Sequence, residues 1–327
     1  MNDGYRETIS HGISYINSSG IASLSKGTYS YQEGISKLAE EIKSAEAILI
    51  GAGAGLSTSA GFYYSGERFE HYFFDFAEKY GIKDMYSGGF YPFPKEEIFW
   101  AWQSRHIYFN RYVPAPRPVY PALLSLVKDK NYFVITTNVD HQFQKAGFDK
   151  KRLFYTQGDY GLLQSVNPAI GKTYNNEEIT AKMLESQGFI KGKDGIYDVP
   201  PDRKLLMEIP PELVPLCPDD GSRMTTNLRS DDNFTEDDGW RRASAAYSAF
   251  LEKNKSRRIL FWELGIGMNT PIIIKYPFWA MAAENTESVY ACINKGEAFC
   301  PDKISERSIC LNADIGSTLE ELKSIIF

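Results

Sequence analysis

Cysteine is scarce in this sequence, with four residues among 327. They are Cys217, Cys292, Cys300 and Cys310, and no two of them form a Cys-x-x-Cys pair. This usage argues against a disulfide framework and is typical of a protein kept in a reducing compartment.

Long apolar runs and an excess of positive charge are also missing. No apolar run approaches the ~20 residues that a membrane-spanning helix needs. The N-terminus shows neither a signal-peptide core nor an Arg-rich, acid-poor transit pattern. The formal net charge is −6, so the basic footprint of a nucleic-acid-binding protein is absent. We expect a cytoplasmic protein that binds neither membranes nor nucleic acid.

Aromatic residues, in contrast, are abundant: 21 Tyr and 20 Phe suit a well-filled core and aromatic pocket walls. Short apolar runs alternate with segments of helical periodicity. The expected strands span 47–50, 131–137, 259–264 and 289–294, and the expected helices 35–45, 69–80, 95–113, 176–187, 236–253 and 316–325. The alternation predicts an α/β fold, a doubly wound, Rossmann-like parallel sheet with helices on both faces.

The expected domain boundaries follow from where the alternation is interrupted. Residues 35–160 and 236–327 form the predicted Rossmann-like domain, with a helical insertion at about 63–115. The proline-rich segment 161–235 predicts a small, irregular module. Residues 1–34 are polar, lack sustained periodicity and are assigned to an N-terminal extension whose role the sequence does not indicate.

A glycine-rich turn, Gly51 to Phe62, follows the first expected strand and opens a helix. Glycines there let the backbone approach a ligand closely, and the helix amides can hold a pyrophosphate. The turn is neither a full Gly-x-Gly-x-x-Gly nor a P-loop, so alone it leaves a plain tight turn open. Polar or glycine-rich loops also end two other strands, at 136–140 and 265–269. Since ligands bind such sheets at the carboxyl ends of strands, this coincidence predicts nucleotide binding.

Together these segments resemble the sirtuin pattern, in order, over roughly residues 35–325. Sirtuins carry Gly-Ala-Gly-Ile-Ser with Ser-Gly-Ile, and this sequence has Gly53-Ala54-Gly55-Leu56-Ser57 with Ala60-Gly61-Phe62. Their later Thr-Gln-Asn-Ile-Asp corresponds to Asn138-Val139-Asp140 here. Their Gly-Thr/Ser-Ser loop corresponds to Gly265-Ile266-Gly267, and their Ile-Asn to Ile293-Asn294. The resemblance implies the sirtuin fold and an NAD site.

One departure from that pattern bears on the reaction. Sirtuin deacylases place a His-Gly after the next strand, and that histidine is the general base. Here Gln157 stands in its place, before Gly158. Glutamine cannot accept a proton near neutral pH as imidazole can. A deacylase needs this base, whereas transfer to an acceptor that is already a carboxylate does not, so deacylation is disfavoured.

A second departure concerns the zinc ribbon. Cys217-Pro218-Asp219-Asp220 keeps one thiol and has Asp220 where a second would stand, and residues 160–172 contain no cysteine. A structural zinc needs about four nitrogen or sulfur ligands. We therefore expect no metal and a packed Cys217.

The run from Gly61 to Phe69, with Gln157-Gly158 and Tyr160-Gly161, resembles the macrodomain-linked class M sirtuins of microbes. This resemblance implies a protein ADP-ribosyltransferase that consumes NAD. It further implies a lipoylated glycine-cleavage H-type carrier protein as acceptor and a macrodomain hydrolase as the reversing enzyme. An NAD hydrolase and a non-enzymatic NAD or ADP-ribose sensor stay open as alternatives.

The catalytic candidates are Asn138, to orient the ribose, Asp140, to hold the carboxamide or offset developing positive charge, and Gln157, to bind ribose hydroxyls and acceptor. An Asx turn or helix cap is the alternative for Asn138 and Asp140. The nucleotide-binding candidates are Gly53, Ala54, Gly55, Ser57, Gly61, Tyr64, Arg68 and Gln103, with Gly265, Gly267, Asn269 and Asn294 for the adenosine half. Packing for Tyr64, a surface ion pair with Glu67 or Glu70 for Arg68, and a solvated helix face for Gln103 are the alternatives.

Overall fold

The computed structural model describes residues 4–19 and 23–327. The chain divides into two compact units. The sheet unit comprises Met1–Gly61, Ala115–Gln157 and Asp238–Phe327, and the insert unit comprises Phe62–Pro114 and Gly158–Asp237. The expected boundaries placed the helical insertion at 63–115 within the Rossmann-like domain; in the structure it groups with the segment that begins at residue 158.

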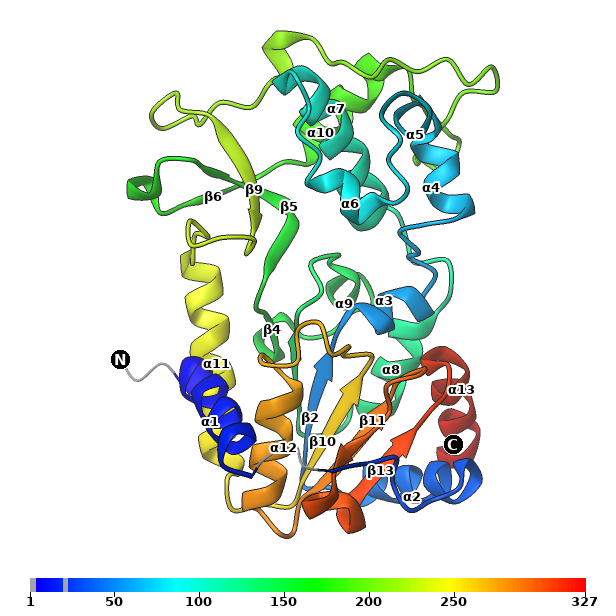
Figure 1. Ribbon diagram of the computed structural model, residues 1–327, viewed down its shortest axis with the longest axis vertical. Coiled ribbons are helices and arrows are strands. Elements are labelled where there is room, and N and C mark those ends of the chain that lie inside the picture. Colours follow the sequence, from blue (N-terminus) through cyan, green and yellow to red (C-terminus); the bar gives the residue numbers. More distant parts are fainter. Residues whose placement is uncertain (1–3, 20–22) are drawn as a thin grey trace. The chain divides into compact units, whose positions relative to one another are not determined.

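The sheet unit is built on six parallel strands (Figure 1). They are β2 (Ala47–Ala52), β3 (Tyr132–Thr136), β4 (Leu153–Tyr155), β10 (Ile259–Leu264), β11 (Val289–Ile293) and β13 (Ser308–Leu311). The order β13-β11-β10-β2-β3-β4 is that of the doubly wound dinucleotide-binding fold, with its switch point between β2 and β10. The predicted fold class is confirmed.

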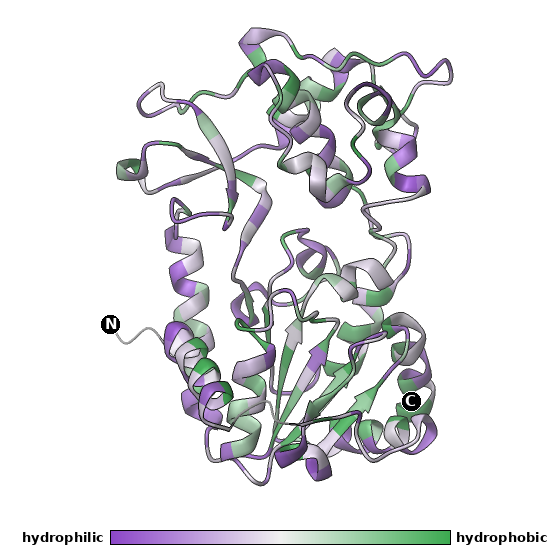
Figure 2. Cartoon of the chain, viewed as in Figure 1, coloured by the Kyte–Doolittle hydropathy of each residue, from purple (hydrophilic) through white to green (hydrophobic). Residues whose placement is uncertain are grey.

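Burial on both faces explains the strand sequences. Every residue of β2 and of β10 is buried, so both strands are mostly apolar rather than alternating, and Glu263 is the one charged residue in them. Figure 2 shows the sheet strands mostly in the hydrophobic colour, with polar colour concentrated on helices and loops. The helices of this unit are α1 (Gly4–Ser19), α2 (Tyr31–Ser44), α3 (Ala54–Ser59), α8 (Val119–Val127), α9 (Gln142–Lys145), α11 (Asp238–Asn254), α12 (Lys275–Glu284) and α13 (Ile315–Ile326). Short 3₁₀ turns occur at Lys150–Arg152 and Asp302–Arg307.

The N-terminal region corrects one expectation. Residues 1–34 were assigned to an extension with no helix or strand predicted in it, yet Gly4–Ser19 form α1 and Tyr31–Ser44 form α2, with residues 1–3 and 20–22 outside the described part. Tyr5 of α1 is 4% exposed and its ring lies 5.0 Å from that of Phe154. The apolar positions of α1 are few, which hid its periodicity. β1 (Leu24–Ser25) then pairs antiparallel with β12 (Cys300–Pro301).

The insert unit combines helices with a small antiparallel sheet. Its helices are α4 (Glu67–Tyr72), α5 (Phe74–Tyr80), α6 (Met85–Gly89), α7 (Glu96–Ile107), a π-helical turn at Tyr108–Tyr112 and α10 (Glu177–Gln187), with 3₁₀ turns at Pro168–Ile170 and Pro211–Leu213. Its strands are β5 (Gly158–Ser165), β6 (Thr173–Asn175), β9 (Met224–Leu228), β7 (Ile190–Lys191) and β8 (Tyr197–Asp198), with the three-stranded order β6-β5-β9.

Aromatic side chains form much of the core of this insert unit. The Trp102 ring lies 4.4 Å from that of Phe73 and 5.2 Å from that of Phe76. Beside them, the fully buried Arg105 donates to Asp75 at 2.6 Å and to Gln187 at 2.7 Å. Burial acts to lower the pKa of Arg105, and the Asp75 carboxylate opposes that effect.

Hydrogen bonds hold the turn at which sirtuins carry their zinc ribbon. The Cys217 amide donates to the Ser222 carbonyl at 2.7 Å, and the Gly221 amide to the Cys217 carbonyl at 2.8 Å. Asp220 accepts from Ser222 and from Asn167. Cys217 is 2% exposed, with its thiol 3.5 Å from the Tyr174 hydroxyl. In the described part of the chain, no cluster of three or more His, Cys, Asp or Glu side chains is arranged to hold a metal ion.

Candidate nucleotide-binding and catalytic site

The glycine turn after β2 contacts the loop after β10 at the switch point of the sheet. The Gly53 amide donates to the Leu264 carbonyl and the Gly55 amide to the Gly265 carbonyl, both at 3.0 Å. A Cβ at Gly55 would lie 2.7 Å from Gly265 Cα, and one at Gly53 would lie 2.8 Å from Gly265 O. The predicted loops therefore meet, and these glycines serve the loop contact itself.

Positive φ is needed elsewhere. Gly53 has an extended backbone with φ −126°, whereas Gly61 has φ 102° and Gly265 has φ 69°. Gly61 follows the end of α3, and a Cβ there would also lie 2.8 Å from Pro116 Cβ. Ala54 and Ser57 lie in the short helix α3 between these glycines.

Asp140 is the centre of a buried hydroxyl network beside the glycine turn. Its Oδ2 accepts from Ser57 Oγ at 2.5 Å and from the Tyr120 hydroxyl at 3.3 Å. Those two hydroxyls are themselves 3.0 Å apart. Burial, followed by the Asp140 charge, raises the pKa of Tyr120 well above its ordinary value. Tyr120 is therefore a permanent hydrogen-bond donor.

Asn138 links the same network to the glycine turn. Its Nδ2 donates to Gly53 O at 2.9 Å and reaches the Tyr120 hydroxyl at 3.5 Å. The Asx-turn alternative is also present, because Asp140 Oδ1 accepts from the Gln142 amide at 3.2 Å. The next residue, His141, has φ 62°, a left-handed conformation uncommon for a residue other than glycine. Asp140 therefore forms the turn through Oδ1 and accepts from Ser57 and Tyr120 through Oδ2.

Gln157 follows β4, the strand beside β3, so it emerges at the same edge as Asn138. It is half-buried, and its Nε2 lies 3.2 Å from Thr156 Oγ1. Thr156 in turn donates its amide and hydroxyl to the Thr136 carbonyl, at 2.9 and 3.2 Å. These two hydrogen bonds to the end of β3 fix the backbone next to Gln157.

The loops assigned to the adenosine half also come together. Asn294, directly after β11, is 9% exposed and donates its side-chain amide to Ile266 O at 3.0 Å. The Met268 amide donates to Glu297 Oε2 at 3.0 Å, and a Cβ at Gly267 would lie 3.2 Å from that oxygen. Asn269 is exposed on the same loop.

Three nucleotide-binding candidates, Tyr64, Arg68 and Gln103, belong to the insert unit instead. Arg68 is not a surface residue paired with Glu67 or Glu70: its guanidinium donates to Asn110 Oδ1 at 2.9 Å and to the Phe109 carbonyl. Burial lowers its pKa. Gln103 is 8% exposed in α7, so the solvated-face alternative is wrong for it.

Tyr64 begins a buried hydrogen-bonded row. Its hydroxyl lies 2.9 Å from that of Tyr160, which lies 3.1 Å from His106 Nε2. Burial, and then the charge of Arg68, lower the pKa of His106 to about 3. The imidazole is therefore neutral at physiological pH and serves as a hydrogen-bonding group.

Two parts of this edge escaped sequence reasoning. One is Tyr120, whose signal is a hydroxyl within an otherwise apolar helical run. The other is Asp314, which accepts from Ser59 Oγ and from Arg117 Nη2, both at 2.9 Å. Although burial acts to raise the pKa of Asp314, hydrogen bonds from Arg117, Ser317 and Ser59 hold it well below its usual range. This cluster ties the end of α3 to the start of α13.

The residues present fit a dinucleotide. The two glycine loops meet without room for a Cβ, as a fold that brings backbone close to a pyrophosphate requires. The amide of Asn138 and the carboxylate of Asp140 lie on one side of the switch point, and the amide of Asn294 lies on the other.

Comparison with known proteins decides the family. No protein-family model matches the chain. A protein ADP-ribosyltransferase of Staphylococcus aureus is 37% identical over 279 residues, which is 85% of this chain and 83% of the relative. The chain belongs to the same family of protein ADP-ribosyltransferases. The ADP-ribosyltransferase is therefore an enzyme, as the sequence predicts.

A fungal relative extends the comparison. A probable bifunctional ADP-ribose hydrolase/ADP-ribosyltransferase of Fusarium oxysporum f. sp. cubense is 30% identical over 300 residues. The match covers 88% of this ADP-ribosyltransferase but 47% of the fungal protein, so the chain spans about half the length of that relative.

Solved Sir2 structures share the fold. Sir2 bound to an acetylated peptide matches with a TM-score of 0.55 and 18% identity, over 90% of this chain and 99% of that one. Sir2 with a p53 peptide and NAD⁺ matches with a TM-score of 0.53 and 18% identity, over 88% of this chain and 96% of that one. Among the described helices of the ADP-ribosyltransferase, none is both long enough and apolar enough to span a bilayer.

Proposed function

We propose that this ADP-ribosyltransferase takes ADP-ribose from NAD, releases nicotinamide, and modifies a lipoylated H-type carrier protein of glycine cleavage. The observation that carries the reaction type is Gln157 at the end of β4, where sirtuin deacylases have their base. Family membership supports the transfer of ADP-ribose to protein. The carrier-protein acceptor is supported by the resemblance of residues 61–69, 157–158 and 160–161 to the macrodomain-linked class.

Asp140 is the group that stabilises the positive charge developing on the ribose. Its carboxylate is 6% exposed and oriented by Ser57 and Tyr120, so it need not reorganise during the reaction. A preorganised charge in a water-poor site stabilises a transition state more than the same charge in water does. When bound, NAD supplies a glycosidic bond whose cleavage develops positive charge at the ribose carbon.

Asn138 and Gln157 position the reactants. The Asn138 side chain is fixed through Nδ2 on Gly53 O, which leaves its Oδ1 for a ribose hydroxyl. Gln157 offers an amide that can donate to, and accept from, ribose and acceptor without taking a proton. Bringing two reactants into one geometry is itself a large part of catalysis of group transfer.

The proton balance favours an anionic acceptor. The bond from the ribose carbon to nicotinamide breaks, and a bond from that carbon to the acceptor forms. A carboxylate acceptor carries no proton to remove, so Gln157 suffices. Tyr64, Arg68 and Gln103 of the insert unit stay proposed NAD-binding residues, with Tyr64 assigned to the nicotinamide and Arg68 to the pyrophosphate.

A macrodomain ADP-ribose hydrolase is the proposed reversing partner. The name of the fungal relative joins a hydrolase and a transferase in one chain, which supports such a pairing. An enzyme that removes the mark would make the modification a switch rather than a permanent change.

The test is an intact-mass assay with free nicotinamide read in parallel. The enzyme and NAD are incubated with the lipoylated carrier, with the unlipoylated carrier, and without acceptor. One added ADP-ribose on the lipoylated carrier alone is the expected result, and Asn138→Ala should abolish it. Nicotinamide release without labelled protein would instead show an NAD hydrolase, and equal labelling of both carriers would refute the requirement for lipoate.

A further inference from the structure

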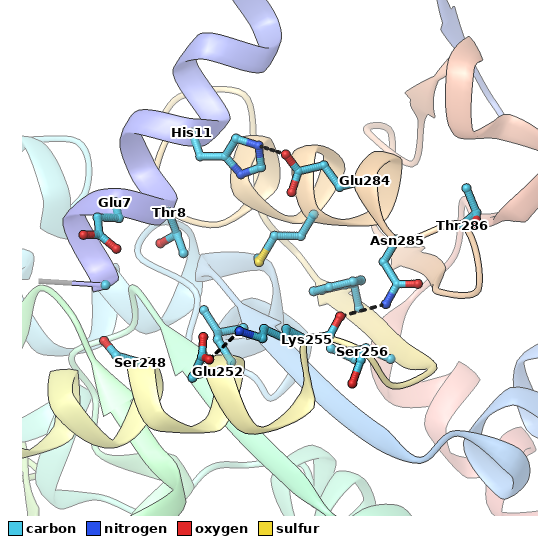
Figure 3. A pocket seen from close by; sticks show the side chains of 15 residues that line it. Glu7, Thr8, His11, Ser248, Glu252, Lys255, Ser256, Glu284, Asn285 and Thr286 are labelled. Atoms are coloured by element: carbon cyan, nitrogen blue, oxygen red, sulfur yellow. Dashed lines mark hydrogen bonds and ion pairs between the residues drawn. The ribbon is translucent and has the colours of Figure 1, made fainter. Parts of the chain in front are cut away.

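A second cavity lies at the opposite edge of the sheet from the glycine loops. It has a volume of about 830 Å³ and is lined by α1, by the ends of α11 and α12, and by β10 (Figure 3). Ile259, which lines it, is the first residue of β10, whereas Gly265 follows the last residue of that strand. Small-molecule sites have volumes of about 300–1,000 Å³. The cavity is therefore of the size that a ligand needs.

Helix α1 packs closely against α11 near Gly4 and against α12 near Gly12, and the cavity lies between these two contacts. A Cβ at Gly4 would lie 2.5 Å from Ser248 Oγ, and one at Gly12 would lie 2.6 Å from the Pro277 nitrogen. Residues 7, 8 and 11, on the intervening turns, line the cavity. Because the helix is in its closest contact on both sides, it cannot settle further into the gap. The hollow is thus a fixed feature of the packing.

Apolar side chains line the inner wall of the cavity. Ile259 and Phe261 come from β10, Leu251 from α11 and Met281 from α12. Phe261 is 2% exposed and packs against Phe278 with ring centroids 5.5 Å apart. This wall would cover a hydrocarbon or aromatic body and gain from the removal of apolar surface from water.

The rim carries an excess of negative charge. Each of the three helices contributes one carboxylate, Glu7, Glu252 and Glu284 (Figure 3). Glu284 is paired with His11 at 2.8 Å and Glu252 with Lys255 at 2.5 Å. Glu7 has no ion-pair partner among the residues that the structure describes.

The helix ends add to this charge. α11 ends at Asn254 and α12 at Glu284, and the residues just beyond both ends line the cavity. A helix carries partial negative charge at its carboxyl end, which favours cations. The amino end of α1 at Gly4 also borders the cavity, and Glu7 in its first turn offsets the partial positive charge there.

We propose that this cavity is a binding site for an organic amine, with the ammonium group at the carboxylate rim and an apolar body against the β10 wall. Charge selects the cation and the wall selects the body, so a neutral or anionic molecule with the same body binds less tightly. The site is separate from the nucleotide site, because the two lie at opposite ends of β10.

The test uses dansylcadaverine, a primary amine on an apolar fluorophore. Its matched controls are N-pentyl dansylamide, which is neutral, and dansyl-6-aminohexanoate, which is anionic. Fluorescence titration of the full chain should show the amine binding at least about fivefold more tightly than the neutral probe, and this preference should fall as salt is added. Equal binding of all three probes, or absence of amine binding, would overturn the proposal.

Variants locate the site. Glu7→Gln should weaken binding of the amine about two- to fivefold and leave the neutral probe unchanged. Glu40→Gln, an exposed carboxylate change on α2, is its control and should have no effect. Thr8→Phe should fill the cavity and abolish binding; Ser256→Tyr at the exposed rim does the same with less risk to folding. Unchanged amine binding in both filled variants would contradict the assignment.

A competition experiment with saturating NAD completes the test. Because the cavity is at the opposite edge, NAD should not displace the bound amine. Displacement of the probe by NAD, at concentrations that saturate nucleotide binding, would place the probe in the nucleotide site and refute the proposal.

Discussion

Replacing Lys275 with methionine should cost about 3–5 kcal/mol of the free energy of unfolding of the sheet unit. Lys275 Nζ donates to Glu263 Oε1 at 2.6 Å, and both side chains are 0% exposed. The Tyr290 hydroxyl donates to Glu263 Oε2 at 2.7 Å, so both carboxylate oxygens are satisfied. Without the ammonium group, Glu263 must be buried unpaired or take up a proton. Either outcome costs free energy that the native pair does not.

The sign of the pH dependence follows from Lys275. Burial acts to lower its pKa, but the charge of Glu263, its hydrogen bond to Lys275 and the neighbouring Cys292 and Glu297 together outweigh burial, so the pKa of Lys275 is raised above its ordinary value. A raised lysine pKa contributes stability that is complete below the unfolded value of about 10.4 and is lost as pH rises through the folded pKa. The part of the cost of Lys275→Met that comes from the lysine charge should therefore be full at pH 7 and shrink as pH rises into the alkaline range.

Urea unfolding followed by tryptophan fluorescence measures the effect, since Trp262 and Trp279 lie in the sheet unit. Lys253→Met, at an exposed position of α11, is the control and should change stability by less than about 0.5 kcal/mol. Adding Glu263→Gln to Lys275→Met should recover much of the loss, because the uncompensated charge is gone. A single variant as stable as the control would refute the reasoning.

Three further predictions concern the loops and the buried hydroxyls. Gly55→Ala should lower the free energy of unfolding by about 1–3 kcal/mol and weaken NAD binding, because its Cβ would strike Gly265. Gly89→Ala is the control and should be neutral, since no atom lies nearer than 4.0 Å to its Cβ. Thermal denaturation measures the stability of both variants, and NAD titration measures their binding. The neutral, buried His106 should make stability fall by up to about 1.4 kcal/mol per pH unit below about pH 6.5, and His106→Gln should remove that slope in urea titrations at pH 5 to 7. Tyr120→Phe should lower kcat for nicotinamide release about tenfold or more with little change in the KM for NAD, since it removes a donor to Asp140; a change confined to KM would contradict that role.

The sheet was predictable where burial dictates sequence. β10 spans 259–264 as expected, because a strand covered on both faces is mostly apolar, and its single charged residue, Glu263, is buried in an ion pair with Lys275. β13, at 308–311, was missed, since Ser308 and Cys310 break its apolar run. α1 was missed because few of its positions face the core. In both cases a neighbouring element decides the structure, and local pattern does not record it.

The site was predictable at its backbone turns and less so at its side-chain partners. Gly53, Asn138 and Asp140 could be predicted as candidates because a strand end followed by small or polar residues is a local signal. Tyr120 was missed, since it belongs to a helix 20 residues before Asp140 and meets it only in the fold. Arg68 was a predicted candidate, but its hydrogen bond to Asn110 depends on packing that sequence spacing does not reveal.

The most direct measurement is the rate of ADP-ribose incorporation into the lipoylated carrier in a single turnover, for the parent enzyme and for Asp140→Asn. Asp129→Asn, at an exposed position, is the control, and circular dichroism confirms that each variant is folded. The account predicts that Asp140→Asn slows transfer on the order of 100-fold or more while Asp129→Asn leaves it unchanged. Transfer by Asp140→Asn within about twofold of the parent rate would show that the preorganised carboxylate does not carry the reaction.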